Sequence, residues 1–454
     1  MAGSPLRGQS PIGTIISEQS RTAFSVQGAG ARATGLGGAF IAVADDATAV
    51  SFNPAGLAQL LKPEVSFVGR GLKRDIAYTD VATIAGTRTQ LASDSLISTT
   101  RFDPLLVSGT VPLRLNGRTL ALQLSAQRFL PLGESDDRDL VETPASGGSS
   151  SELEQSIHQR GQIDLYSFAI AYEASERILL GLSANAWRGA WDLDSHSSKT
   201  TGGSTSFVDF RQSNRLDGMN YNLGLIWRWP TWSLGLVRRT GFHGDYTFGT
   251  DTLISKGGAP VSRNAPDITV GLHWPATTGI GFAYRPAERW LVTADLTHTT
   301  WSDARYMTTQ RNLNGLNFFD LDKGTRTPNA TDFHLGTEHL FVTRGGKVVS
   351  LRGGVSREPQ PVVDAVTSEQ RVIYSASLGA GIKFGRYSFD AAYRYGWSKR
   401  SASQFLDVDQ ILSRIPPTSL GTERVREQRL VFDCIIQFDR EPVQKLLHHL
   451  FVGD

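Results

Sequence analysis

The sequence predicts an all-β fold, a transmembrane antiparallel β-barrel of about 14 strands with an N-terminal plug inside its lumen. Three features support this prediction: a glycine-rich leader, strand-like segments joined alternately by short turns and long connections, and a period of two within those segments. The chain has 454 residues, a net charge of +2 and a mean hydropathy of −0.21. It contains no run of eighteen apolar residues, which argues against a bundle of transmembrane helices. A barrel escapes that test because only every second strand residue faces lipid.

Turns and loops alternate from residue 63 onward. The pair Asn116-Gly117 is the strongest short hairpin signal in the chain. Further short turns are expected at 173–176, 229–231, 285–288, 344–346 and 385–386, and long loops at 131–155, 195–213, 249–265, 303–328, 358–370 and 400–423. Short periplasmic turns opposite long external loops are typical of outer-membrane barrels. A soluble β-sandwich would show shorter strands without this regular alternation.

The expected strands have the alternation that a barrel wall requires. In the last one, 424–438, apolar residues occupy the even positions from 430 onward, while Asp433 and Gln437 fall on the other face. The apolar face is expected to look outward, because the inverse would place charges in hydrocarbon. Charged residues that this places in the lumen are Asp295, Glu338, Arg352, Asp390 and Arg394. Aromatic residues near strand ends suit interfacial girdles, namely Trp187, Trp191, Trp227, Trp229, Trp290, Trp301, Tyr284, Tyr395 and Trp397.

Two interpretations of the lumenal charges stay open. They can form a paired ladder that satisfies the interior and grips the plug, since unpaired buried charge is costly. Alternatively, Arg352 or Arg394 guides an acidic head group through the lumen.

The leader, residues 28–60, reads GAGARATGLGGAFIAVADDATAVSFNPAGLAQL. Its glycines and small residues allow the backbone to approach its neighbours closely. A dinucleotide-binding loop is the competing interpretation of Gly28-x-Gly30, but the required βαβ surroundings and the acidic residue after a second strand are missing. In Asn53-Pro54 we expect a turn, because Asn takes turn conformations and Pro fixes the next φ, with a hinge that responds to ligand as the further hypothesis.

The leader resembles the N-terminal plug signature of the FadL/TodX family of outer-membrane hydrophobic-compound transporters. The second half of the chain resembles the same family in order, through 275–286, 294–296, 300–302, 335–339, 351–354, 358–359, 378–381 and 390–393. The resemblance is weakest from about 80 to 215, where long connections dominate.

The resemblance implies a hatch (1–61), a transmembrane barrel (62–438) and passive uptake of hydrophobic compounds such as long-chain fatty acids or hydrocarbons. It places gating on the hatch, at Gly35, Gly37, Gly38, Asp45, Asp46, Asn53 and Pro54. Phe24, Phe40 and Phe52 are the expected ligand contacts. The partners are then hydrophobic small molecules together with outer-membrane lipid and lipopolysaccharide. The location is the outer membrane of a Gram-negative-type cell.

Both ends of the chain raise questions. Residues 1–7 lack the apolar core of a signal peptide, so we expect that the signal was removed or that the start codon is misassigned. In 439–454, Val443, Leu446, Leu447 and Leu450 follow Pro442 at helical spacing. This tail is expected to form a short amphipathic helix on the periplasmic side, and a partner-docking role there is the alternative. A non-transporting scaffold or shuttle barrel that binds secreted proteins is accordingly the second hypothesis.

No enzyme, cofactor or metal site is expected. The nine histidines are scattered, and His448-His449 have no Cys or carboxylate at ligand spacing. There is no G-x-S-x-G elbow, and the lone Cys434 can form neither an internal disulfide nor a thiolate site. The charge balance of 46 basic and 44 acidic residues gives no field that would attract nucleic acid.

Overall fold

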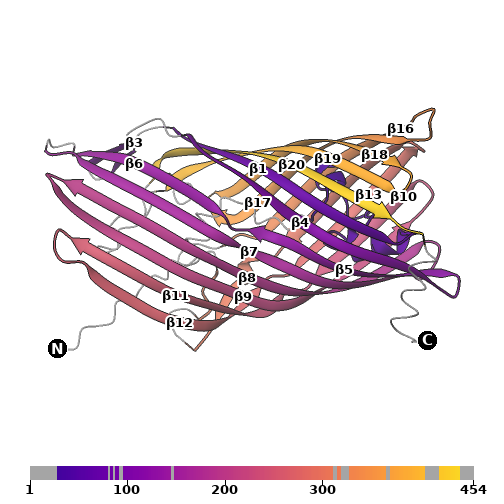
Figure 1. Cartoon of the computed structure of the whole chain (residues 1–454), viewed down its shortest axis with the longest axis horizontal. Helices are drawn as coiled ribbons and strands as arrows, with labels where there is room; N and C mark the ends of the chain where they lie inside the picture. Colours follow the sequence, from indigo (N-terminus) through magenta and orange to yellow (C-terminus); the bar gives the residue numbers. More distant parts are fainter. Residues whose placement is uncertain are drawn as a thin grey trace.

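The computed structural model of the chain describes residues 28–79, 82–84, 87–91, 96–144, 148–309, 314–318, 327–363, 369–403 and 419–439. One antiparallel sheet closes on itself into a barrel (Figure 1). The first wall strand, β1 (Glu64–Thr79), pairs with the last, β20 (Ser419–Gln437), from Glu64↔Gln437 to Thr79↔Thr422. In the part of the chain that the structure describes, no helix is long and apolar enough to cross a membrane.

The predicted count of fourteen wall strands is confirmed when two interrupted strands are each counted once. Between β1 and β20 the wall consists of β4 (Leu96–Leu115), β5 (Arg118–Pro131), β7 (Ser151–Glu173), β8 (Ile178–Thr201), β9 (Ser204–Arg228), β10 (Trp232–Arg239) with β11 (Phe242–Lys256), β12 (Val261–Trp274) with β13 (Thr277–Ala287), β14 (Trp290–Thr299), β16 (Ala330–Val342), β17 (Val348–Val363), β18 (Gln370–Phe384) and β19 (Tyr387–Ser403). Four short strands lie outside this set: β2 (Ala82–Ile84), β3 (Thr87–Leu91), β6 (Glu134–Pro144) and β15 (Arg305–Met307).

The hairpin turns follow the prediction at one end of the barrel and depart from it at the other. Asn116 and Gly117 have φ of 51° and 78° between β4 and β5, the positive values that a two-residue hairpin loop needs. The loop expected at 195–213 is wrong, because β8 and β9 continue to a turn at Gly202-Gly203. Much of 131–155 and 249–265 is likewise strand. Serine- and threonine-rich strands outside lipid carry little apolar alternation, so their sequence looks like loop.

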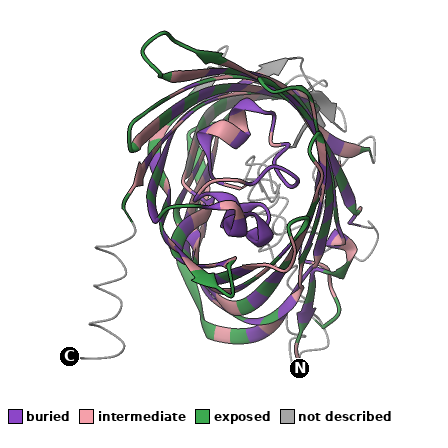
Figure 2. Cartoon of the chain, turned by 90° about the vertical axis from the view of Figure 1, so that its right-hand side faces the viewer, coloured by how far each residue is buried: buried purple, intermediate pink, exposed green. Residues whose placement is uncertain are grey.

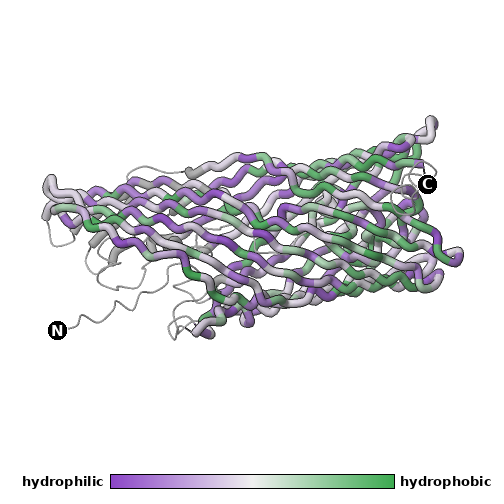
Figure 3. Tube along the Cα trace, turned by 60° about the horizontal axis from the view of Figure 1, so that its bottom comes forward, coloured by the Kyte–Doolittle hydropathy of each residue, from purple (hydrophilic) through white to green (hydrophobic). Residues whose placement is uncertain are grey.

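The polarity of the wall inverts along its tallest strands. Low on β8, Leu180 and Leu182 face outward, 43% and 41% exposed, as lipid-facing residues should be. Higher on the same strand Asp192 faces outward, while Trp191 and Leu193 are buried inside. Figure 3 shows the same division along the barrel, with one half mostly hydrophobic and the other mostly hydrophilic. The apolar half is the membrane band, and β7, β8 and β9 rise beyond it as a wall with an apolar inner face.

This inversion corrects part of the predicted aromatic girdles. Trp187, Trp191 and Trp301 are at most 4% exposed and lie inside, because above the membrane band the inner face is the apolar one. Trp227 and Trp290 do face outward near the short turns, 43% and 50% exposed, and agree with the prediction.

Residues 28–60 lie inside the ring of strands, as Figure 2 shows in the view along the barrel. They form a one-turn helix, α2 (Ala31–Gly35), and two 3₁₀ helices, η1 (Ala49–Ser51) and η2 (Pro54–Gln59), joined by turns. Small side chains pack here against the wall, with Ala33, Ala44, Ala49, Ala55 and Ala58 buried in one cluster. Residues 28–60 are called the hatch below. Phe24 and residues 440–454 of the predicted tail lie outside the described residues.

Candidate transport pathway

Carboxylates of the wall hold the backbone of the hatch. Asp295 on β14, only 2% exposed, accepts hydrogen bonds from the backbone N–H groups of Phe40 (2.6 Å) and Ile41 (2.8 Å). Asp433 on β20 accepts one from the N–H of Ala31 at 2.8 Å. Charge-assisted bonds of this kind are stronger than neutral ones. The hatch is therefore fastened through its main chain to two separate strands of the wall, β14 and β20.

A chain of alternating charges runs from the hatch into the wall. Arg32 of α2 donates to both carboxylate oxygens of Glu338 at 3.0 Å and also pairs with Asp45. Glu338 accepts in turn from Arg352 at 2.5 Å, and Arg352 pairs with Asp390. Glu338, Arg352 and Asp390 are all buried. Of the two interpretations given above, this geometry favours a paired ladder over a free guanidinium at Arg352.

The second acidic residue of the hatch is held locally. Asp46 accepts bonds from the backbone N–H (2.8 Å) and hydroxyl (2.6 Å) of Thr48, and lies 4.0 Å from Arg32. Burial raises the pKa of its carboxyl, although Arg32 acts in the opposite direction. Asp46 thus shapes the turn that leads into η1.

Asn53 connects the hatch to two wall strands. Its amide group donates to the carbonyl oxygens of Ile41 (3.0 Å), Leu225 (3.2 Å) and Leu236 (3.4 Å), while its Oδ1 accepts from the N–H of Ala55 at 3.2 Å. Asn53 is fully buried and caps η2, with Pro54 as the first residue of that helix. The turn expected at Asn53-Pro54 is present, and the side chain of Asn53 adds a clamp between β9, β10 and the hatch.

Glycines of the wall let the hatch lie directly against it, a feature that the sequence analysis missed. A Cβ added to any of several inward-facing glycines would overlap hatch backbone; these are Gly181, Gly224, Gly235, Gly281, Gly336 and Gly354. On the hatch side, Gly37 (φ +69°) lies where a Cβ would be 2.7 Å from the backbone nitrogen of Val355, and Gly38 (φ +92°) faces the His334 ring. Gly35 approaches Gly379 and Arg352. Glycines at inward positions of neighbouring strands were the sequence signal that could have predicted this close contact between the hatch and the wall.

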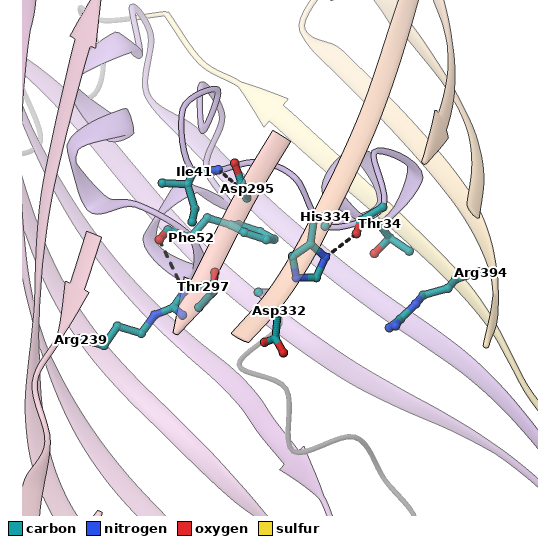
Figure 4. Close-up of a pocket in the computed structure, with 12 residues that line it drawn as sticks. Thr34, Ile41, Phe52, Arg239, Asp295, Thr297, Asp332, His334 and Arg394 are labelled. Carbon is teal, nitrogen blue, oxygen red and sulfur yellow. Dashed lines mark hydrogen bonds between the residues drawn. The ribbon is translucent and has the colours of Figure 1, made fainter. Parts of the chain in front are cut away.

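Three cavities lie around the hatch, and Phe52 and Gly28, which are in contact, both border the first of them. The hatch cavity, about 560 Å³, is lined by Phe52, Ile41, Asp295 and His334 among others (Figure 4). The Nδ1 of His334 lies 2.7 Å from the carbonyl oxygen of Gly37. Arg394 borders this cavity from the other side and pairs with the buried Glu358 at 2.6 Å.

The other two cavities differ in chemistry. The aromatic cavity, about 550 Å³, is bordered by Phe129, Trp187 and Trp274 together with asparagine side chains. The arginine cavity, about 560 Å³, is lined by Arg70, Arg128, Arg394 and Arg429 beside apolar residues such as Leu105 and Leu130. The aromatic cavity suits an aromatic or alkyl group. The arginine cavity adds four guanidinium groups, each of which is paired with a carboxylate of the wall.

The arginine cavity lies where two wall strands part. β4 and β5 pair from Leu115↔Arg118 to Leu106↔Gln127, and no pair is recorded beyond this point among the described residues. Here Arg101 of β4 instead donates side-chain bonds to the carbonyls of Gly133 and, at 3.4 Å, of Pro131. The wall at this point is held by a guanidinium rather than by a backbone ladder.

A cluster of aromatic side chains lies on the inner face of the wall above the hatch. It includes Trp187, Trp191, Phe242, Tyr246, Phe248, Trp274, Trp301, Tyr306 and Phe318, all at most 8% exposed. The residues after β14 contribute to it through η3 (Trp301–Asp303) and β15. Apolar surface inside a wall whose outer face is polar is favourable for binding apolar molecules.

Two of the three predicted ligand contacts can be placed. The rings of Phe40 and Phe52 meet edge to face with centroids 5.2 Å apart, and Phe52 lines the hatch cavity, whereas Phe40 is fully buried. Within the described residues, no group of three or more His, Cys, Asp or Glu is arranged to hold a metal ion.

Comparisons with known proteins agree with this architecture. Residues 14–421 match the family described as outer membrane protein transport protein (OMPP1/FadL/TodX). Among solved structures, a FadL homologue of Pseudomonas aeruginosa aligns with 92% of this chain and 100% of its own, at 14% identity and a TM-score of 0.63. The toluene transporter TodX of P. putida aligns over 91% and 99% (16% identity, TM-score 0.58), and the toluene transporter TbuX of Ralstonia pickettii over 92% and 100% (14%, 0.54).

A search of the curated proteins finds no match. The structural likenesses, at these identities, establish the fold, and the family match extends over most of the sequence. The chain is therefore an outer-membrane β-barrel that belongs to the OMPP1/FadL/TodX family of transport proteins.

Proposed function

We propose that this barrel mediates passive uptake of hydrophobic compounds, fatty acids or hydrocarbons, past a hatch that shifts locally and stays in the lumen. The observation that supports it most directly is the arrangement of three cavities around the hatch, which share lining residues. Gly28 borders both the hatch cavity and the arginine cavity, and Arg239 borders both the hatch cavity and the aromatic cavity. A small movement of Phe52 away from Gly28 would connect the hatch cavity with the arginine cavity.

The hatch as a whole is too firmly held to leave during transport. Backbone N–H groups of the hatch donate to Asp295 and Asp433, and backbone carbonyls of the hatch accept hydrogen bonds from Ser233 and Gln123. The side chain of Arg32 also donates to Glu338. Each bond to a charged group contributes about 1.5–3 kcal/mol, so release of all of them is too costly for passive transport. The Phe52 side chain, by contrast, borders open space and is held mainly by packing.

The path we propose begins in the aromatic cluster, because an apolar solute gains free energy on leaving water. It passes Phe52 and reaches the arginine cavity, where β4 and β5 part and an apolar molecule can leave sideways into the bilayer. For a ligand with a carboxylate, Arg394 is the better placed of the two candidate arginines, since it borders two of the cavities while Arg352 borders none of the three and is paired with both Glu338 and Asp390.

Substitution of Phe52 tests the local gate. Phe52→Ala is expected to accelerate uptake of labelled oleate or labelled toluene into proteoliposomes several-fold, because removal of the ring opens space between the hatch cavity and Gly28, which also borders the arginine cavity. Phe52→Trp is expected to slow it. The two variants should leave the heat-modifiable mobility of the folded barrel on SDS gels unchanged.

The substrate class is read from the same assay. Oleate uptake without toluene uptake indicates an acid transporter, the reverse indicates a hydrocarbon channel, and transport of neither compound by folded protein would contradict the proposed function. Equal rates for Phe52→Ala, Phe52→Trp and the unmodified chain would contradict the gate alone.

A further inference from the structure

A second weak point in the wall lies between β9 and the strand formed by β10 and β11. β10 ends at Arg239 and β11 begins at Phe242, while the neighbouring strand breaks between Trp274 and Thr277. The pairs Arg239↔Thr277 and Phe242↔Trp274 put the two interruptions side by side.

On its other side, the interrupted strand also loses register with β9. β9 pairs with β10 as far as Asn222↔Arg239 and with β11 only from Asp217↔Asp245. Residues 218–221 of β9 fall outside both registers. Residues 218–221 of β9 therefore lie opposite residues 240–244 without a regular ladder of backbone hydrogen bonds.

Side chains hold the wall together where the ladder is missing. The backbone N–H of Thr240 donates to the Tyr221 carbonyl at 2.8 Å, but the N–H of Tyr221 donates to the Thr240 hydroxyl at 3.0 Å. The amide of Asn220 donates to the Thr240 carbonyl at 3.2 Å. Side-chain bonds can be exchanged by rotamer changes without separating strands, which a backbone ladder does not permit.

The ring of Phe242 fills the remaining space. It lies so close to Gly218 that a Cβ there would overlap it, and a Cβ on Gly244 would come within 3.0 Å of its Cε2. The ring also packs on Trp187 and Trp274, with centroids 5.0 and 6.2 Å away. Glycines on both flanks are thus what allows one aromatic side chain to close the interruption.

The interruption separates the aromatic cavity from the lipid-facing surface. Asn220, Thr240, Trp274 and Pro275 all border that cavity. Outside, Met219 and Tyr221 are 54% and 48% exposed on the apolar band. Immediately above them the outer face turns polar, at the ion pair of Arg188 with Asp217 (3.0 Å). The interruption therefore sits at the upper edge of the membrane band.

We propose that this interruption is a side port, closed by Phe242, through which apolar molecules dissolved in the outer leaflet reach the aromatic cavity directly. Rotation of the Phe242 ring off Gly218 opens it. Its ligands are neutral alkyl or aromatic groups, because the cavity behind it is lined by aromatic rings and uncharged amides next to Arg239 and the outer approach is apolar.

Thiol labelling from within the bilayer tests the port. The background is Cys434→Ser, which removes the only native thiol, with Asn222→Cys as a reporter in the aromatic cavity. Proteoliposomes are exposed either to N-dodecylmaleimide, which stays in the membrane, or to a sulfonated maleimide, which stays in water. Adding Phe242→Ala is expected to raise labelling by the membrane reagent several-fold with little change for the aqueous one, and Phe242→Trp is expected to lower it.

Phe248→Ala is the matched control, since Phe248 belongs to the same aromatic cluster and the same strand but lies away from the interruption. Equal acceleration by Phe248→Ala, equal acceleration of the aqueous reagent, or no effect of Phe242→Ala would each overturn the port. If Phe242→Ala does not fold, Gly218→Ala replaces it, because the added methyl displaces the ring. Labelling reports arrival in the cavity rather than transport, so its result is independent of the oleate and toluene assays.

Discussion

Replacement of Glu338 with alanine is expected to undock the hatch and open the barrel to ions. Glu338 is 4% exposed and lies between two guanidiniums, accepting two bonds from Arg32 and one from Arg352. Removal of one partner of a buried ion pair costs about 3–5 kcal/mol. A loss of that size shifts the docking equilibrium by about two to three and a half orders of magnitude. Single-channel recordings in planar bilayers should show long conducting events that the unmodified protein does not show.

The control for this experiment is Asp194→Ala. Asp194 pairs with Arg211 at 3.0 Å on the outer surface, where the two side chains are 49% and 78% exposed. Exposed pairs contribute little to stability, so this variant should conduct like the unmodified protein. If Glu338→Ala stays as closed as Asp194→Ala, the charge chain does not secure the hatch.

Gly354→Val is expected to expel the hatch by steric overlap while the barrel stays folded. A Cβ at Gly354 would overlap the backbone nitrogen of Gly37, and its cross-strand neighbour Gly336 touches the backbone of Leu36 in the same way. Overpacking of a core costs about 1–3 kcal/mol when side chains can adjust, and backbone atoms adjust less than side chains. The expected readouts are raised conductance and new protease cleavage within residues 28–60, with unchanged heat-modifiable mobility.

The next residue along the same strand supplies the control. A Cβ on Gly353 would meet only ordinary contacts, the nearest being Leu378 Cδ2 at 3.9 Å. Gly353→Val adds the same side chain to the outward face and should leave conductance and cleavage unchanged. Equal effects of Gly353→Val and Gly354→Val would show that strand distortion, not contact with the hatch, is responsible.

The sequence predicted the barrel because its signals are local. Alternation along 424–438 and the pair Asn116-Gly117 each determine structure within one hairpin, and the structure agrees with both. The other short turns, which lie at the same end of the barrel, could be predicted for the same reason. Polar alternation along the last strand correctly placed Asp433 inside.

The upper wall was not predicted because, above the membrane band, the apolar residues of a strand face inward rather than outward. Outside the membrane band, Trp191 and Leu193 face inward while Asp192 faces outward, and alternation alone carries no information on which face meets lipid. A loop is predicted at 195–213, where β8 and β9 instead form the hairpin that ends at Gly202-Gly203. Knowledge of where the membrane band ends would have been needed, and that depends on the tilt and register of neighbouring strands.

The candidate pathway was predicted in its components but not in its connections. Asp295, Glu338, Arg352, Asp390 and Arg394 were placed in the lumen from alternation. The two that hold the hatch have partners 306 and 254 positions away in the sequence, Arg32 for Glu338 and Ile41 for Asp295, and no local pattern encodes such pairs. The interruption at Thr240 was hidden for the same reason, since it is visible only as a shift of register between strands.

The grip on the hatch has an evolutionary consequence. Asp295, Asn53 and Ser233 bind main-chain atoms, and the wall glycines also face main chain, so docking does not depend on which side chains the hatch displays toward the cavities. Ile41 illustrates the separation: its N–H and carbonyl are both bonded, while its side chain lines the hatch cavity. Selection can therefore change ligand preference at Ile41 without weakening the docking of the hatch, and relatives with different ligands can share one mode of docking.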